Sequence, residues 1–183
     1  FIRERSGLDV KVAAVGRKAR DFFRRREMPI RSEFVNIFSK LDYGHAKEIA
    51  ESVMQAYSDG EVDAVYMVYN EFKSVIQQRI VVEKILPPSR IEADSTQPQR
   101  DYIFEQEPQE IFNRMLPRYV EIQIYRALLE SAASEHGARM ASMETATKNA
   151  GDMIDALTLN MNRIRQAAIT REIIEVVSGA GAL

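Results

Sequence analysis

Apolar residues over the first hundred positions alternate between short continuous runs and helix-spaced stripes. The run at residues 10–15 predicts a buried strand ending at Gly16. A helix over residues 17–26 should follow, with Phe22 and Phe23 directed inward. Residues 34–41 contain only a short apolar stripe, to which no strand is assigned. Apolar residues three and four positions apart then predict a second helix over residues 43–57.

Two β-rich runs follow this helix. Residues 62–69 are almost continuously apolar, which is typical of a strand covered on both faces. Residues 75–86 form a second such run, ending at Pro87 and Pro88, and residues 89–100 indicate an exposed loop. Residues 102–104 are a candidate last strand. Together these elements predict a layered, Rossmann-like α/β domain over residues 1–107.

The pattern changes from Pro108 onward. A short helix over residues 109–116 is expected to be interrupted or restarted at Pro117. The remaining 66 residues contain no proline. If they are helical throughout, they extend about 100 Å, which is too long to fold back inside one small domain. The sequence therefore predicts a second region, residues 108–183, dominated by one long C-terminal helix.

Apolar positions along this helix follow steps of three and four residues, which is the pattern of a coiled-coil seam. The alternation breaks once, around His136, where two steps of four occur in succession and should locally unwind the supercoil. A helix with such a seam needs a partner helix of similar length. The seam comprises Ile122, Tyr125, Leu129, Met140, Met143, Ile154, Leu157, Met161 and Ile164, with Ala132, His136, Thr147 and Ala150 between them and Ala168 after them.

Composition narrows the function classes. The formal net charge of −2 provides no general attraction for nucleic acid. The absence of cysteine excludes disulfides, cysteine-ligated zinc and a thiol nucleophile. Phosphate-loop, dinucleotide-binding, serine-hydrolase and zinc-protease motifs are also absent, so no catalytic residue, cofactor or metal is assigned. The two histidines, His45 and His136, are expected at a helix start and in the seam.

The C-terminal tract at residues 169–182, ITREIIEVVSGAGA, resembles the signature of the F-type ATP synthase gamma subunit family. It has Ile-Thr-x-Glu, an acidic residue three positions later, and then Gly-Ala. Residues 121–154 and 157–167 are similar to the family's long helix, and residues 15–26 and 65–88 are similar to its α/β domain. The family begins with a long basic helix and a first strand. Neither is recognisable here, so the chain is expected to lack both.

This resemblance implies a non-catalytic rotor shaft. The long helix would form half of an antiparallel coiled coil with the missing N-terminal helix, inside a hexamer of alpha and beta subunits. The α/β domain would form a foot attached to the epsilon subunit and the ring of c subunits. The complex would lie peripherally at the cytoplasmic face of a bacterial inner membrane, and no run in this chain approaches the ~20 apolar residues of a membrane span.

The resemblance also suggests three sets of contact residues. Arg165, Gln166, Thr170 and Glu172 would contact the beta subunits, the alternative being a solvated helix face. Small uncharged residues at the C-terminus would form the part of the shaft that turns in an apolar bearing of the hexamer, the alternative being a frayed end. These bearing residues are Val177, Gly179, Ala180, Gly181, Ala182 and Leu183; Tyr102 and Glu105 would face the c-ring from the foot.

Two other classes of function stay open at this stage. One is a free-standing α/β ligand-binding or enzyme domain with a coiled-coil dimerisation helix, which nucleotide binding by the isolated chain would favour. The other is a helical adaptor that pairs with itself, which a symmetric dimer in solution would favour. Copurification with a hexameric ATPase would favour the shaft.

Overall fold

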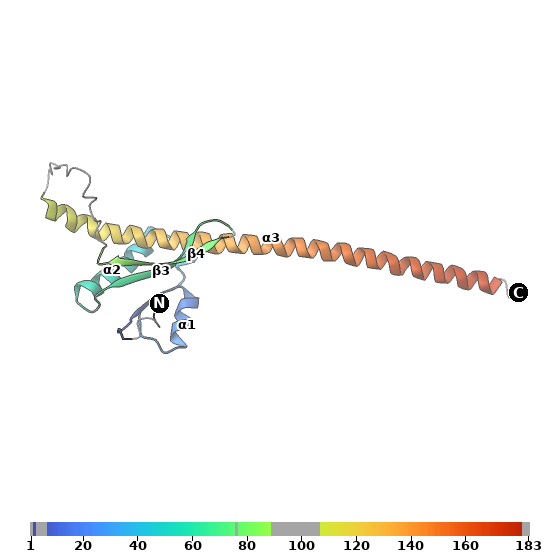
Figure 1. Ribbon diagram of the computed structural model, residues 1–183, viewed down its shortest axis with the longest axis horizontal. Helices are drawn as coiled ribbons and strands as arrows, with labels where there is room; N and C mark the ends of the chain where they lie inside the picture. The colour runs from blue at the N-terminus through green and yellow to red at the C-terminus, as the bar shows by residue number, and fades with distance from the viewer. Residues whose placement is uncertain (1, 3–6, 76, 89–106, 181–183) are drawn as a thin grey trace. The chain divides into compact units, whose positions relative to one another are not determined.

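The computed structural model of the chain describes residues 2, 7–75, 77–88 and 107–180 (Figure 1). The predicted loop at 89–100 and the candidate strand at 102–104 lie outside these residues. The chain divides into two compact units, Phe1–Glu135 and His136–Leu183. Among the described residues, no helix is both long enough and apolar enough to cross a membrane.

The first unit begins with a β-α-β element. Strand β1 (Val12–Val15) pairs in parallel with β2 (Ile30–Phe34), and helix α1 (Arg17–Arg24) connects them. Gly16 lies between β1 and α1 with φ of 94°, a conformation that glycine adopts without steric cost, and its N–H donates to the carbonyl of Phe34 at 2.7 Å. The predicted strand and helix are thus confirmed. Strand β2 was not predicted, because charged residues alternate with the others in this short segment and give it the composition of a loop.

The prediction that Phe22 faces inward is wrong. Its side chain is 43% exposed, and α1 contains no fully buried residue. Successive helical residues point about 100° apart, so a helix of this length directs only one of two adjacent phenylalanines toward the sheet. The ring of Phe22 instead meets the partly buried Phe23 edge-on at 5.3 Å, and the Arg26 guanidinium lies 4.0 Å from the Phe22 centroid.

Helix α2 (Tyr43–Ser58) follows a short 3-10 turn, η2 (Ile37–Ser39). Asp42 is its N-cap, and its carboxylate accepts the backbone N–H of Tyr43 at 2.6 Å. His45 completes a capping box, since its Nδ1 accepts the backbone N–H of Asp42 at 3.4 Å. The prediction that His45 serves a helix start is confirmed.

Replacing Asp42 by alanine is therefore expected to destabilise the first unit by about 1 kcal/mol, because the N-terminal N–H groups of α2 lose their side-chain acceptor. This loss of stability should be measured as a lower midpoint of urea denaturation. Asp42→Asn retains an acceptor oxygen and serves as the control. Equal destabilisation by both substitutions would contradict a capping role.

The other two strands form a hairpin. Strand β3 (Val65–Phe72) pairs antiparallel with β4 (Gln78–Leu86), and in the described residues this sheet is separate from the β1–β2 sheet. Tyr69 on the inner face is 8% exposed, whereas Val68 and Ile80 on the outer face are 59% and 72% exposed. The prediction that the strand over residues 62–69, now β3, is covered on both faces is therefore wrong. The helices of the first unit cover only one side of the hairpin.

Helix α3 (Pro108–Ala180) is continuous over 73 residues and begins in the first unit. The expected interruption at Pro117 does not occur. Pro117 removes one backbone hydrogen bond, yet helix-forming residues on both sides continue the helix through it. Pro108 occupies the first helical position, where a missing N–H carries no penalty.

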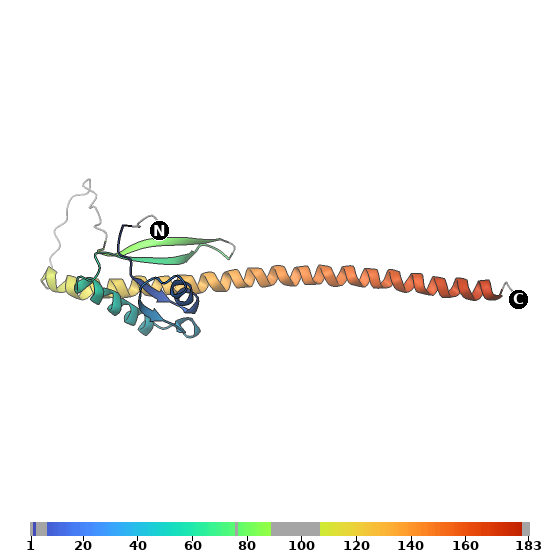
Figure 2. The same cartoon turned by 90° about the horizontal axis from the view of Figure 1, so that it is seen from below.

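The core of the first unit forms where α2 and the hairpin pack against the beginning of α3, in the region shown in Figures 1 and 2. Ala46 and Ala50 of α2 have no exposed surface, which allows close approach of the helix backbone. Val120, Ile124 and Leu128 contribute the inner face of α3, with Ile37, Ile49, Ile85 and Leu86 completing the core. The prediction of an α/β domain followed by one long C-terminal helix is confirmed.

Candidate helix-pairing surface

Helix α3 carries two opposed apolar faces in the first unit. Val120 and Leu128, on one face, are 2% and 6% exposed in the core, whereas Ile122 and Leu129 remain 49% and 45% exposed. Two residues along a helix correspond to about 200° of rotation, so Ile122 points away from the core that holds Val120. Ile122 and Leu129 of the predicted seam are therefore not used for packing on the α/β domain.

Tyr125 lies at the border between these two faces. It is partly buried, and its ring meets that of Tyr43 edge-on at 5.5 Å. The Tyr43 hydroxyl donates to the carboxylate of Glu121 at 2.5 Å, and this hydrogen bond raises the pKa of Tyr43. Tyr125 is consequently held in place by α2, with only part of its surface open to a partner.

In its described residues, 136–180, the second unit consists of the continuation of α3, and its predicted seam residues are solvent-exposed. Exposed fractions lie between 56% and 63% for Met140, Met143, Ile154, Leu157, Met161 and Ile164. A soluble protein rarely leaves so many large apolar side chains uncovered along one helix without a binding function. The surface is a candidate site for pairing with another helix.

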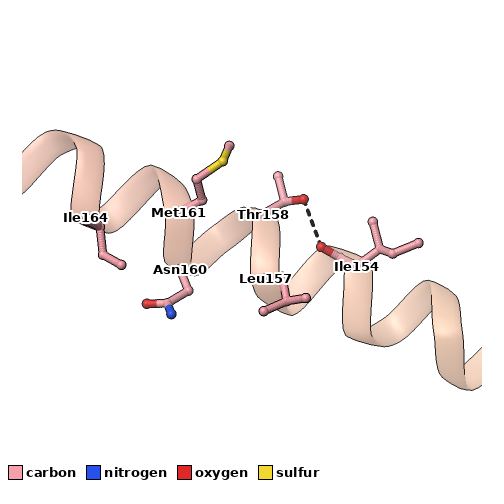
Figure 3. Close-up of a pocket in the computed structure, with 6 residues that line it drawn as sticks. All are labelled: Ile154, Leu157, Thr158, Asn160, Met161 and Ile164. Atoms are coloured by element: carbon pink, nitrogen blue, oxygen red, sulfur yellow. Dashed lines mark hydrogen bonds between the residues drawn. The ribbon is translucent and has the colours of Figure 1, made fainter.

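A shallow apolar groove lies on this surface. Figure 3 shows its six lining side chains, with Leu157, Asn160 and Ile164 projecting to one side of the helix; the others are Ile154, Thr158 and Met161. The Thr158 hydroxyl donates to the Ile154 carbonyl at 2.8 Å, and the Thr147 hydroxyl similarly donates to Met143. Each threonine thereby satisfies its donor within the helix and can present its methyl group to a partner.

The apolar stripe changes face near the C-terminus. A second groove is lined by Ile169, Glu172, Ile173, Val176 and Val177. The five residues from Ile164 to Ile169 advance the helix by a net rotation of about 140°. This second face was not predicted, although the spacing of residues 169, 173 and 176 could have revealed it. A partner helix that follows the seam up to Ile164 does not cover it.

The predicted polar contact residues lie around this change of face. Arg165, Gln166, Thr170 and Glu172 are all exposed. The Thr170 hydroxyl donates to the Gln166 carbonyl at 2.8 Å, so it remains available mainly as an acceptor. Within the part of the chain that the structure describes, the side chains of Arg165, Gln166 and Glu172 form no hydrogen bond or ion pair.

The remaining predicted contacts are only partly described. Val177 is 64% exposed, Ala180 is exposed, and the space beside Gly179 is open on the outside of the helix. Gly181, Ala182 and Leu183 lie outside the described residues, as do Tyr102 and Glu105. Over residues 2, 7–75, 77–88 and 107–180, no cluster of three or more acidic or histidine side chains could hold a metal ion.

Sequence comparison relates the chain to one family. The family model described as ATP synthase matches residues 2–183. The chain is 50% identical over 182 residues to the ATP synthase gamma chain of Solibacter usitatus, covering 100% of this chain and 63% of the relative. It is also 50% identical to that of Pelotomaculum thermopropionicum, covering 100% of this chain and 64% of the relative. The chain thus spans less than two thirds of the length of these curated relatives.

Structural comparison agrees. The chain superimposes on a chain of the Tetrahymena thermophila mitochondrial ATP synthase, in a structure of its central stalk and c-ring, with a TM-score of 0.58 and 28% identity, covering 80% of this chain and 64% of that one. A chain of the Euglena gracilis enzyme matches with a TM-score of 0.62 and 17% identity, covering 99% and 64%. Because the family model matches residues 2–183 and the relatives are gamma chains, the chain belongs to the ATP synthase gamma-chain family.

Proposed function

We propose that this chain is the greater part of the central rotor shaft of an F-type ATP synthase, coupling rotation of a c-ring to conformational change in an alpha/beta hexamer. The observation that carries the proposal is the exposed heptad seam of α3 in a chain of the gamma family. A shaft acts by stabilising one arrangement of a multi-state assembly at each angle, which requires binding surfaces and no bond-making groups. We infer that the chain itself is non-catalytic.

The occupant of the seam is a helix from a part of the parent chain outside this sequence. The curated relatives have the necessary additional length, since the chain spans 63% of the first of them. A second helix would cover Leu157, Met161 and their neighbours and would form the antiparallel coiled coil that the resemblance implies. In this organisation residues 1–107 are the foot and 108–183 the coiled-coil helix, whose first part also packs into the core of the foot.

The C-terminal end of α3 then acts as the bearing. Ile173, Ile174 and Val177 are 58%, 59% and 64% exposed, and at 100° per residue they lie within about 100° of one another on one side of the helix. This apolar face lies about 180° around the helix from Ile164, so it suits contact with a surrounding sleeve better than continued pairing along the seam. Val177, Gly179 and Ala180 belong to this bearing, and Gly181, Ala182 and Leu183 would extend it.

The beta-subunit contacts occupy the junction between seam and bearing. Arg165, Gln166 and Glu172 have donors and acceptors not used within the described chain, and Thr170 retains an acceptor. An arginine guanidinium can bind a partner carboxylate through two parallel hydrogen bonds. We therefore assign these four residues to the grip between shaft and catalytic subunits.

The foot would contact the epsilon subunit and the c-ring, with Tyr102 and Glu105 as the proposed c-ring contacts. The assembled protein would be peripheral to the membrane, at the cytoplasmic face in a bacterium. No nucleic-acid partner and no cofactor is part of this function. Neither the ligand-binding domain nor the self-pairing adaptor has a specific observation in its favour.

The proposal is tested by expressing the full parent chain with alpha and beta subunits from a close relative. Copurification in a stoichiometry of one chain per hexamer, with ATP-driven rotation of a bead on the foot, is the expected result. A symmetric homodimer that excludes the hexamer, or tight nucleotide binding by the chain alone, would refute it.

The grip and the bearing should respond differently to mutation. Replacing both Arg165 and Gln166 by alanine is expected to weaken shaft–hexamer binding about tenfold or more and to reduce torque, because charge-assisted hydrogen bonds are lost. Deleting residues 179–183 should reduce torque only modestly. Torque is measured from bead rotation under viscous load.

Arg171→Ala is the matched control, since it removes a nearby exposed arginine outside the proposed grip. The division between grip and bearing would be wrong if the deletion stopped ATP-driven rotation while the double substitution had no effect.

A further inference from the structure

Ser134 joins α3 to both strands of the hairpin. It has no exposed surface and is the one buried polar side chain among the described residues. Its hydroxyl donates to the carbonyl of Asn70 in β3 at 3.2 Å. In return, the side-chain amide of Gln78 in β4 donates to the Ser134 carbonyl at 3.1 Å. One helical residue thus forms hydrogen bonds with both strands near the end of the hairpin where β3 leads into β4.

The residue type fits this close approach. A fully buried position between a helix and a hairpin has no room for a larger side chain, and a hydroxyl is small enough to reach a strand carbonyl. Alanine would fit equally well but would leave the Asn70 carbonyl without this donor. Serine therefore meets both requirements, small volume and a directional hydrogen bond.

Directional contacts of this kind resist rotation of a helix about its own axis. The apolar contacts of Val120, Ile124 and Leu128 depend on contact area and only weakly on angle. The hydrogen bonds of Ser134 depend steeply on angle, as does the Tyr43–Glu121 bond at the other end of the packed segment. Thirteen residues, or about 20 Å of helix, separate these two fixed points.

We propose that Ser134, with Gln78 and the Asn70 carbonyl, forms a torsional clamp that prevents α3 from turning about its own axis against the hairpin when the shaft carries torque. Ser134 is then a positioning residue, since it touches no catalytic group and acts by fixing the rotational angle of the helix that bears the grip. This role rests on the proposed rotor function, although the clamp itself can be tested without it.

The first test is hydrogen exchange on the full parent chain. In Ser134→Ala, amides at the Asn70 and Gln78 ends of the hairpin should exchange about tenfold faster, because one anchoring hydrogen bond is lost. Gln78→Met, which keeps the side-chain length and removes the donor, should act in the same direction. Ser142→Ala is the matched control, because Ser142 lies on the same helix and is exposed. If exchange at the hairpin ends matches that of the control in both variants, there is no clamp.

The second test measures torsional stiffness in the assembled complex. With the hexamer stalled and a bead on the foot, the angular variance of the bead should rise about twofold in the Ser134→Ala, Gln78→Met double variant, since a directional contact between α3 and the hairpin is lost. Ser142→Ala should leave it unchanged. Faster exchange with unaltered angular variance would overturn the torsional role. A wild-type chain that never assembles with the hexamer would contradict the proposed function while leaving the exchange test of the clamp intact.

Discussion

Replacing Leu157 by aspartate is expected to abolish pairing of the long helix with its partner helix while the first unit remains folded. Leu157 lies in the middle of the exposed groove and is 61% exposed in this chain. Covering it in a coiled coil contributes about 2 kcal/mol, and burying an unpaired carboxylate there costs several more. This sum is comparable to the total stability of a typical domain.

The effect should depend on the presence of the partner helix. In the present chain, helix content by circular dichroism should be nearly unchanged by Leu157→Asp, because no partner contact exists to be lost. In the full parent chain, the thermal unfolding transition of the coiled coil should fall below room temperature or disappear, and copurification with the hexamer should be lost.

Ala156→Asp is the matched control, because it introduces the same charge one residue earlier and about 100° around the helix, away from the groove. It should leave the thermal unfolding transition and the copurification with the hexamer close to those of the wild type. If the parent chain tolerated both substitutions equally well, the seam would not be the pairing surface.

The elements with a strong periodic signal were predictable from sequence. Helix α2 has regular apolar spacing and a capping residue before it, and both its ends were placed within a residue. The unbroken helix after Pro117 was predicted for the same reason. The seam also followed from spacing alone, since a heptad pattern is a property of one helix and requires no knowledge of tertiary contacts.

The features that depend on tertiary contacts were not predictable. Strand β2 has only five residues, and Arg31 and Glu33 give it the composition of a loop. Arg31 finds its partners in the fold, where its guanidinium donates to Glu61 at 3.0 Å and lowers the pKa of that carboxyl. The burial of Ser134 is likewise invisible in sequence, because it requires the hairpin to reach α3 from more than fifty residues away.

The two faces of α3 show what the apolar spacing of this helix could not decide. The seam residues in the first unit alternate with residues such as Val120 and Ile124, which have the same apolar character and the same spacing. Sequence spacing alone leaves open which stripe packs on the α/β domain and which one remains exposed. The structure places the stripe of Val120 in the core and leaves that of Ile122 exposed.

This assignment leads to a prediction with opposite outcomes for two neighbouring residues. Val120→Asp is expected to destabilise the first unit by about 4 kcal/mol or more, because a carboxylate replaces a side chain that is 2% exposed in the core. Ile122→Asp should change the stability of this chain by less than about 0.5 kcal/mol, because the side chain is 49% exposed. In the parent chain, Ile122→Asp should instead weaken helix pairing.

Urea denaturation monitored by circular dichroism distinguishes these outcomes, with Val120→Thr as an isosteric control that carries no charge. Burial raises the pKa of the introduced carboxyl above its unfolded value. Below this raised pKa the carboxyl is protonated in the folded state while it is still ionised in the unfolded state. The stability deficit of Val120→Asp relative to wild type should therefore shrink as pH falls through the raised pKa. A deficit of equal size for Val120→Asp and Ile122→Asp in this chain would show that α3 does not present one face to the core and the other to a partner.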